Sequence, residues 1–292
     1  FLAGLWETFV AVELGEFARA EATLARMHAI AEQTRQPTHR WIAGYVGAAL
    51  TCIRGDLEAG ERLAEHALQI GQEASEPDAA MVYGATVLES RGAQGRGAEV
   101  IALVEQTVAS NPGIPAWDAG LSRLYCFTDR RPEGAEVLAR AVAKHFQHIR
   151  CDTAQMSALA GYADTAAQTR SLEAAGMLHT LMEPYADQFV WNGVAGYGHA
   201  RMYLAMLDAT LGRHDRADAH FAFSCGFHRE HGLRIWEARS ELGWAEALAD
   251  RGATDRARGH AARALELSQQ HGYGAFEPRA AAILASLATI ET

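Results

Sequence analysis

Few of the residues that interrupt helices occur in this chain. Its 292 residues include only seven prolines, and runs of β-branched residues are nearly absent. Proline is the residue that a helix interior tolerates least, and β-branched residues favour strands. Hydrophobic residues make up 49% of the sequence, which is enough for a large buried core. The composition therefore predicts an all-α fold.

Basic charge and long apolar runs are also scarce. Lysine occurs once, at Lys144, and 36 acidic residues outnumber 26 basic ones, which gives a formal net charge of −10. Binding to nucleic-acid phosphates needs clustered basic side chains, and no helix face is expected to carry such a cluster. The longest apolar stretches, such as residues 41–53, are shorter than the roughly 20 residues of a membrane span. Neither nucleic acid nor a membrane is expected as a partner.

Paired cysteines are absent too. The four cysteines lie far apart and form no Cys-x-x-Cys motif: Cys52, Cys126, Cys151 and Cys225. Free thiols in a reducing compartment are expected, which favours a cytoplasmic location. Residues 145–151 and 225–231 each combine two histidines and a cysteine at intervals of three, a spacing that suits zinc on one helix face. Three ligands on one helix rarely converge on one ion, so no metal or other cofactor is predicted, although zinc at either group stays open.

The strongest signal in the sequence is internal repetition. A turn-forming residue followed five places later by a small residue recurs along the chain, as in Gly15 with Ala20 and Gly55 with Gly60. These anchors lie near residues 15, 55, 95, 130, 170, 212 and 252, at intervals of 35 to 42 residues. Such even spacing indicates a repeat architecture.

Each anchor is expected to join two helices. Glycine adopts the left-handed conformation that ends a helix, and an acidic residue favours the start of the next one. One helix pair cannot bury its own apolar face, so neighbouring pairs must stack. The sequence therefore predicts a single right-handed superhelical solenoid over residues 1–292, with about seven helix–turn–helix repeats. Residues 277–290 are expected to form a C-terminal capping helix, and an upstream segment is expected to cover the apolar start at Phe1–Trp6.

The repeats resemble tetratricopeptide repeats, in a longer variety of about 40 residues per unit. The resemblance is sharpest in Asn111–Trp117, Leu181–Ala186 and Leu211–Phe221. These stretches are similar to the C-terminal sensor region of bacterial regulators with a STAND-type ATPase domain, joined to a LuxR-type DNA-binding domain or an adenylate/guanylate cyclase domain. They also resemble the helical-repeat sensor of the maltose-regulon activator. The resemblance implies a sensor arm that holds or releases the ATPase domain of the same polypeptide. The chain lacks a Gly-x-x-x-x-Gly-Lys-Ser/Thr phosphate loop, so only the sensor region is expected here.

Tetratricopeptide register places the first helix of each pair on the concave surface of the solenoid. Counting back from each anchor gives a candidate groove of mixed aromatic, thioether and charged side chains, which suits an extended peptide or a helix. The candidate ligand-binding residues are Tyr45, Trp117, Phe127, Asp164, His199, Met202, Met206, Arg239 and Glu246. A register shift of one residue would instead place Tyr45 and Trp117 in the core between repeats.

Signals for other kinds of site are weak. The glycine-rich stretch at residues 191–201 precedes a helix, so its amides could hold an anion, but a loop with close helix packing is the stronger interpretation. The chain contains no Gly-x-Ser-x-Gly or His-Glu-x-x-His motif. No catalytic residues are predicted, and the chain is not expected to be an enzyme.

The expected function is that of a sensor and protein-interaction module that binds a protein or peptide segment in the groove. A receptor for a small-molecule inducer, bound near Trp117, Asp164, His199 and Arg239, is the first alternative. An enzyme with a pocket inside the superhelix is a weaker one. The spread of candidate residues over five repeats favours the first interpretation.

Overall fold

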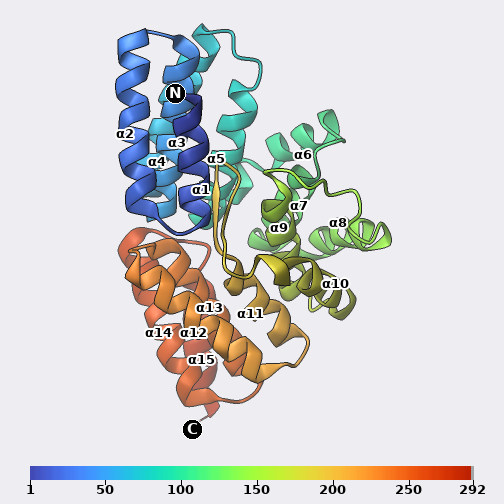
Figure 1. The fold of residues 1–292 in the computed structure, drawn as a ribbon. Helices are drawn as coiled ribbons and strands as arrows, with labels where there is room; N and C mark the ends of the chain where they lie inside the picture. Colours follow the sequence, from blue (N-terminus) through green and yellow to red (C-terminus); the bar gives the residue numbers. More distant parts are fainter. Residues whose placement is uncertain (291–292) are drawn as a thin grey trace.

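The computed structural model describes residues 1–290, and this part of the chain contains fifteen α-helices and one short β-hairpin (Figure 1). The first helices are α1 (Leu2–Glu13), α2 (Phe17–Thr34), α3 (Pro37–Arg54), α4 (Leu57–Glu73), α5 (Ala79–Ala93), α6 (Ile101–Ser110) and α7 (Pro115–Phe127). The later ones are α8 (Arg131–Ala143), α9 (Gln155–Gln168), α10 (Leu172–Met182), α11 (Ala200–Thr210), α12 (His214–Glu230), α13 (Arg234–Asp250), α14 (Thr254–His271) and α15 (Glu277–Ile290). The prediction of a helical fold is confirmed.

The turns between paired helices fall at the anchors that the sequence spacing indicated. Five anchor glycines have φ between +72° and +98°, the left-handed region that glycine enters without a Cβ clash: Gly15, Gly55, Gly95, Gly212 and Gly252. At the other two turns, the non-glycine residues Asp129 and Arg170 take this conformation. Helix starts follow the sequence as well, because Pro37 and Pro115 open α3 and α7, and the Asp56 carboxylate accepts a hydrogen bond from the Ala59 amide at the start of α4.

The glycine-rich stretch is not a loop, as the sequence suggested, but a hairpin. Strand β1 (Phe189–Trp191) pairs antiparallel with β2 (Gly196–His199), and every residue of both strands is buried. The hairpin contacts α1, α3, α9, α11, α12 and α13, which come from both ends of the chain. It therefore lies in the middle of the molecule with helices around it (Figure 1).

Glycine makes this close packing possible. A Cβ at Gly196 would lie 2.3 Å from the Ile53 side chain. A Cβ at Gly198, whose φ is +90°, would lie 2.9 Å from the Trp236 ring. The hairpin can thus approach α3 and α13 only because these two positions have no side chain.

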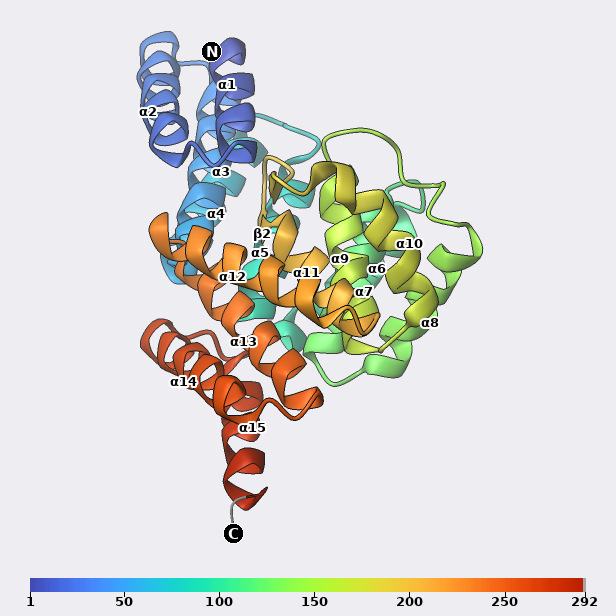
Figure 2. The same cartoon turned by 60° about the horizontal axis from the view of Figure 1, so that its bottom comes forward.

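The N-terminal and C-terminal helices meet beside the hairpin. The Tyr273 hydroxyl donates a hydrogen bond to the Gly55 carbonyl at 3.1 Å, and the Ala275 amide donates to the Ala93 carbonyl at 3.1 Å. These bonds join the turns after α3 and α5 to the turn after α14. Helix α15 packs on α13 and α14 at the far end, where Figure 2 shows it extending away from the rest of the molecule. No helix among residues 1–290 has both the length and the apolar character needed to cross a membrane.

Replacing Gly198 with alanine should destabilise the fold by roughly 1–3 kcal/mol, because the new Cβ meets Trp236 and the backbone is left-handed there. Urea unfolding followed by circular dichroism measures this change. Gly259→Ala is the matched control: Gly259 lies in α14, where an added Cβ would have nothing within 4 Å, and its replacement should stabilise by about 0.5–1 kcal/mol. Equal effects at the two positions would contradict the packing described for the hairpin.

Candidate functional site

The structure contains a cleft of about 940 Å³. Its walls come from the turn between α9 and α10, from α11 and α13, and from the capping helix α15. The side chains that line it include those of Gln168, Met206, Arg239, Glu246 and Arg279. Three of the predicted groove residues, Met206, Arg239 and Glu246, therefore share one cavity.

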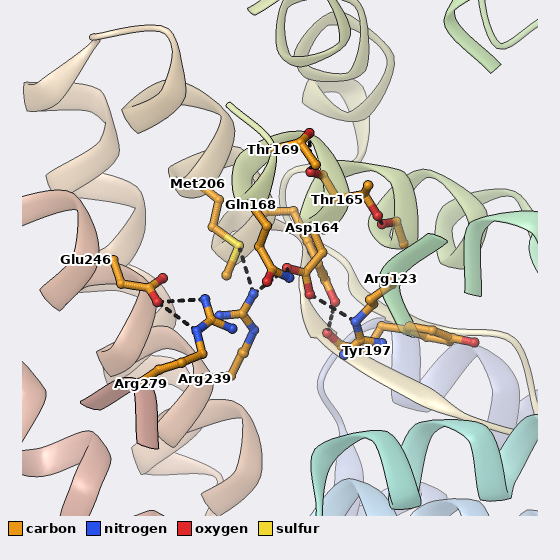
Figure 3. A network of polar contacts seen from close by, with 12 residues as sticks. Arg123, Asp164, Thr165, Gln168, Thr169, Tyr197, Met206, Arg239, Glu246 and Arg279 are labelled. Atoms are coloured by element: carbon orange, nitrogen blue, oxygen red, sulfur yellow. Dashed lines mark hydrogen bonds and ion pairs between the residues drawn. The ribbon is translucent and has the colours of Figure 1, made fainter. Parts of the chain in front are cut away.

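Asp164 lies directly behind the inner end of the cleft and holds three side chains there. Its carboxylate accepts hydrogen bonds from Arg123 Nε at 3.0 Å, from Gln168 Nε2 at 2.8 Å and from Arg239 Nη2 (Figure 3). Arg123 also pairs with Glu89. The Asp164 side chain has no exposed surface, so this is a buried ionic network that joins α5, α7, α9 and α13.

The arginines keep Asp164 ionised despite its burial. Burial alone would raise the pKa of this carboxyl, but the guanidinium groups of Arg239 and Arg123 outweigh it, and the pKa lies below its ordinary value. Arg279 behaves in the complementary way. Burial would lower its pKa, whereas the carboxylates of Glu246 and Asp164 raise it above the ordinary value. The inner end of the cleft therefore carries fixed charges.

Two arginines at the cleft have N–H groups without acceptors. Arg239 is 1% exposed, and its Nε and Nη1 atoms are buried with no partner among residues 1–290. Arg279 holds Glu246 through Nε at 2.9 Å and through Nη2 at 2.6 Å, while its buried Nη1 has no partner in the described chain. A buried donor without an acceptor costs about 1–3 kcal/mol. Groups of this kind are rare in native proteins and call for an explanation.

The other predicted groove residues do not reach the cleft. Tyr45 packs against Trp41 with ring centroids 5.1 Å apart, and its pKa is raised to about 12 by burial. Trp117 and Met202 are buried in the core, the latter against the hairpin at Gly198. These three residues follow the core interpretation that the sequence left open for Tyr45 and Trp117.

Phe127 lies beside the ionic network but not in the cleft. Its ring packs against the Arg123 guanidinium at 4.8 Å and against Phe276 at 6.3 Å. The cavity wall does not include it. Phe127 thus packs against the buried ionic network and does not line the cleft.

His199 belongs to a separate buried cluster. Its ring contacts Phe223 and Phe227, and its backbone N–H donates to His228 Nε2 at 3.0 Å. His228 Nδ1 lies 3.0 Å from the Ser240 hydroxyl, so both of its ring nitrogens are engaged. Burial lowers the pKa of His199 to about 4 and that of His228 well below its ordinary value.

The histidine and cysteine groups do not form metal sites in the described chain. Helix α8 ends at Ala143, so residues 145–151 do not share a helix face, and the expectation that they would is wrong. In the second group, His228 is occupied by the bonds described above. Among residues 1–290, no three His, Cys, Asp or Glu side chains are arranged to hold a metal ion.

Sequence reasoning missed two arginines of the site. Arg279 lies in the capping helix, which was expected only to close the end of the stack. Arg123 lies one position before Leu124, which falls on a groove position in the tetratricopeptide register, so the count passed over it. The signal that could have found Arg279 is its place near the start of a helix whose residues after it are all small or apolar.

Comparison with known proteins adds no relative. The chain matches no model of a known protein family, and no curated protein sequence is similar to it. The geometry of the site therefore carries the functional argument.

Replacing Asp164 with asparagine should destabilise the protein by about 3–5 kcal/mol, because Arg123 and Arg239 lose the charge that compensates their burial. The control is Asp250→Asn, which breaks an exposed pair with Arg170 and should cost less than about 1 kcal/mol. Denaturant unfolding of both variants at neutral pH makes the comparison. Similar losses would show that the buried network does not contribute as described.

Acid should destabilise the fold through His199 and His228. Below pH 6.5 their side chains gain protons in the unfolded chain, whereas His199 stays neutral in the folded protein down to about pH 4. The unfolded state then binds more protons than the folded state. Each histidine therefore lowers the free energy of unfolding by about 1.4 kcal/mol for every pH unit by which the pH falls within this window. His199→Gln should reduce this slope by about one histidine's share, while His66→Gln, on an exposed part of α4, should leave it unchanged. Unfolding curves between pH 4 and 7 measure the slope, and an unaltered slope for His199→Gln would refute the assignment.

Proposed function

We propose that this chain is a non-catalytic sensor module that binds a small organic molecule in the cleft between α9, α11, α13 and α15. The observation that carries the proposal is the cleft itself: its volume of about 940 Å³ suits a small ligand, and it brings Met206, Arg239 and Glu246 together. Of the functions considered from the sequence, the small-molecule receptor fits this geometry better than the peptide groove.

The position of the hairpin supports this choice. A peptide bound along the first helices of the repeats would need their inner surface to be open. Strands β1 and β2 contact α1, α3, α9, α11 and α13, and these strands are buried throughout. The chain therefore occupies with its own backbone the surface that a peptide would use.

The wider setting of the module is proposed from its architecture. Seven helix pairs with turns every 35 to 42 residues, followed by α15, are consistent with a right-handed superhelical solenoid of the tetratricopeptide type. This arrangement supports the resemblance to the sensor region of bacterial STAND-type regulators, LuxR-type or cyclase-linked. In such a protein the module works in the cytoplasm, and ligand binding alters how it holds the ATPase domain.

A protein-binding surface is a second candidate. Helix α1 and the residue after it leave four large apolar side chains exposed at intervals of four residues, which places them on one face: Leu2, Trp6, Val10 and Leu14. Exposed apolar patches of this kind are typical of contacts with another protein. The ATPase domain of the same polypeptide is the partner that the resemblance implies.

An enzymatic role is less well supported by the same cleft. Most of its charged groups are arginines, which do not exchange protons near neutral pH; of the other titratable groups, His214 is exposed and Asp250 pairs with Arg170. Glu246 is held by Arg279 through two nitrogens. Residues of this kind hold and orient a ligand.

A thermal-shift screen of small metabolites should find compounds that stabilise the protein. A ligand at a hundred times its Kd adds about 2.7 kcal/mol, which corresponds to a rise of several degrees in Tm. Ala247→Trp places a bulky side chain in the cleft and should reduce or abolish the shift, whereas Ala285→Trp makes the same change at an exposed position of α15 outside the cleft and should retain it. Compounds that stabilise both variants equally would place binding elsewhere and reject the proposed site.

A further inference from the structure

The unpartnered N–H groups of the cleft point to a ligand of one charge class. Arg239 is nearly fully buried, and only its Nη2 is engaged, by Asp164 and by the Met206 sulfur at 3.9 Å. Its Nε–H and Nη1–H groups belong to different edges of the guanidinium, and neither has a partner among residues 1–290. Arg239 and Arg279 both line the cleft, and the charges of both guanidinium groups act on Asp164 (Figure 3).

The guanidinium groups of Arg239 and Arg279 have buried N–H donors for which the described chain supplies no acceptor. Arg279 contributes Nη1, a third buried nitrogen without a partner in the described chain. Two guanidinium groups side by side repel each other, and an anion between them would remove that repulsion as well as accept their N–H bonds. Because Nη2 of Arg239 and the Nε and Nη2 atoms of Arg279 are already engaged, an anion would accept single charge-assisted hydrogen bonds from the free nitrogens, and these are stronger than bonds to a neutral acceptor.

The charged residues that line the cleft also favour an anionic ligand. Five arginines line it, and only two acidic residues do, although the chain as a whole has a net charge of −10. The side chain of Arg131, at the start of α8, forms no ion pair or hydrogen bond within residues 1–290. The cationic lining is therefore local to the cleft and opposes the charge of the rest of the surface.

The other side chains that line the cleft indicate which further chemical groups the ligand carries. Leu172, Ala247 and Ile283 give the cleft an apolar surface beside the arginines. Gln168 Oε1 is a buried acceptor without a donor among the described residues, and the Gln168 amide and Arg239 bind the same oxygen of Asp164. A ligand with an anionic head, an apolar body and a hydroxyl or N–H donor near the head would satisfy each of these groups.

We infer that the ligand of this cleft is a small organic acid, a carboxylate or a phosphate monoester with an apolar body, whose oxyanion accepts hydrogen bonds from Arg239 and Arg279. The inference rests on the proposed function and adds the chemical class of the ligand. Glu246 acts as a positioning residue, because it holds the Nε and Nη2 side of Arg279 and leaves Nη1 for the oxyanion.

Three probes that share a phenyl ring test the chemical class of the ligand. The protein is titrated at low salt with 3-phenylpropanoate, with phenyl phosphate and with the uncharged 3-phenylpropanamide, and binding is followed by calorimetry and by the arginine Nε–H signals in ¹⁵N spectra. At least one of the two anions should bind about tenfold more tightly than the amide, the effect of one charge-assisted hydrogen bond. The Nε–H signal of Arg239, identified by its absence in Arg239→Lys, should shift on binding.

Arg279→Gln should weaken binding of the anion by about tenfold or more, since it removes one of the two guanidinium groups. Arg201→Gln is the matched control: Arg201 also pairs with one carboxylate, Asp187, at a partly exposed position, but it lies outside the cleft. This variant should change the Kd less than about twofold. Circular dichroism of each variant verifies that it is folded.

The outcomes separate the ligand class from the proposed function. Binding of the amide as tight as that of the anions, or equal losses in Arg279→Gln and Arg201→Gln, overturns the inference. If amide binding is then lost in Ala247→Trp, the cleft is still a small-molecule site and the proposed function stands. If neither anion binds and the metabolite screen finds no compound sensitive to Ala247→Trp, both fail.

Discussion

The rest of the site depends on the carboxylate of Asp164, which is buried between two arginines. It joins Arg123, 41 residues earlier, to Arg239, 75 residues later, and so fixes α7, α9 and α13 relative to one another. Burying three charged groups is costly, and such networks persist where their geometry specifies an arrangement that apolar packing would leave loose. Here the arrangement directs Nη2 of Arg239 to Asp164 and leaves Nε and Nη1 without a partner in the described chain.

The hairpin sets where a ligand can bind. Phe189 and Trp191 of the hairpin are buried among helices from several parts of the chain, so these helix faces are closed to a partner. The Trp191 indole N–H donates to the Phe9 carbonyl at 3.1 Å, which joins the hairpin to α1. The cleft lies instead where α15, which packs on α13 and α14, faces the same cavity as α11. The capping helix thus becomes a wall of the site.

The sequence predicted the helical turns well and the hairpin not at all, for different physical reasons. A left-handed turn is a local event, and Gly15, Gly55 and Gly252 mark it without help from the rest of the chain. Strands of three and four residues carry too little periodicity to be recognised, and this hairpin forms because helices from both ends of the chain pack against it. Its glycines, which looked like loop residues, serve the close approach to Ile53 and Trp236.

The candidate site, like the fold, could be predicted from the sequence only in part. Register within a repeat placed Asp164, Met206, Arg239 and Glu246 on inward helix faces; in the structure Arg239 pairs with Asp164 and lines the same cleft as Met206 and Glu246. Register within a repeat says nothing of how far the stack curves, so it could not separate residues that reach the cleft from Tyr45 or Trp117, which are packed between helices. Nor could it find Arg279, because the position of a terminal helix over the preceding pairs is a tertiary property.

A ligand held by Arg239 and Arg279 would act on the structure as well as occupy it. The two arginines come from α13 and α15, and their free N–H groups share one acceptor only while these helices keep their present spacing. Binding energy that exists in one arrangement and not in others stabilises that arrangement by the difference. Glu246 already supplies one tie between the two helices through Arg279, so an anion adds a second tie at the same place. The cleft is thus placed where occupancy changes how firmly the C-terminal helix is held, which is the property that a sensor requires.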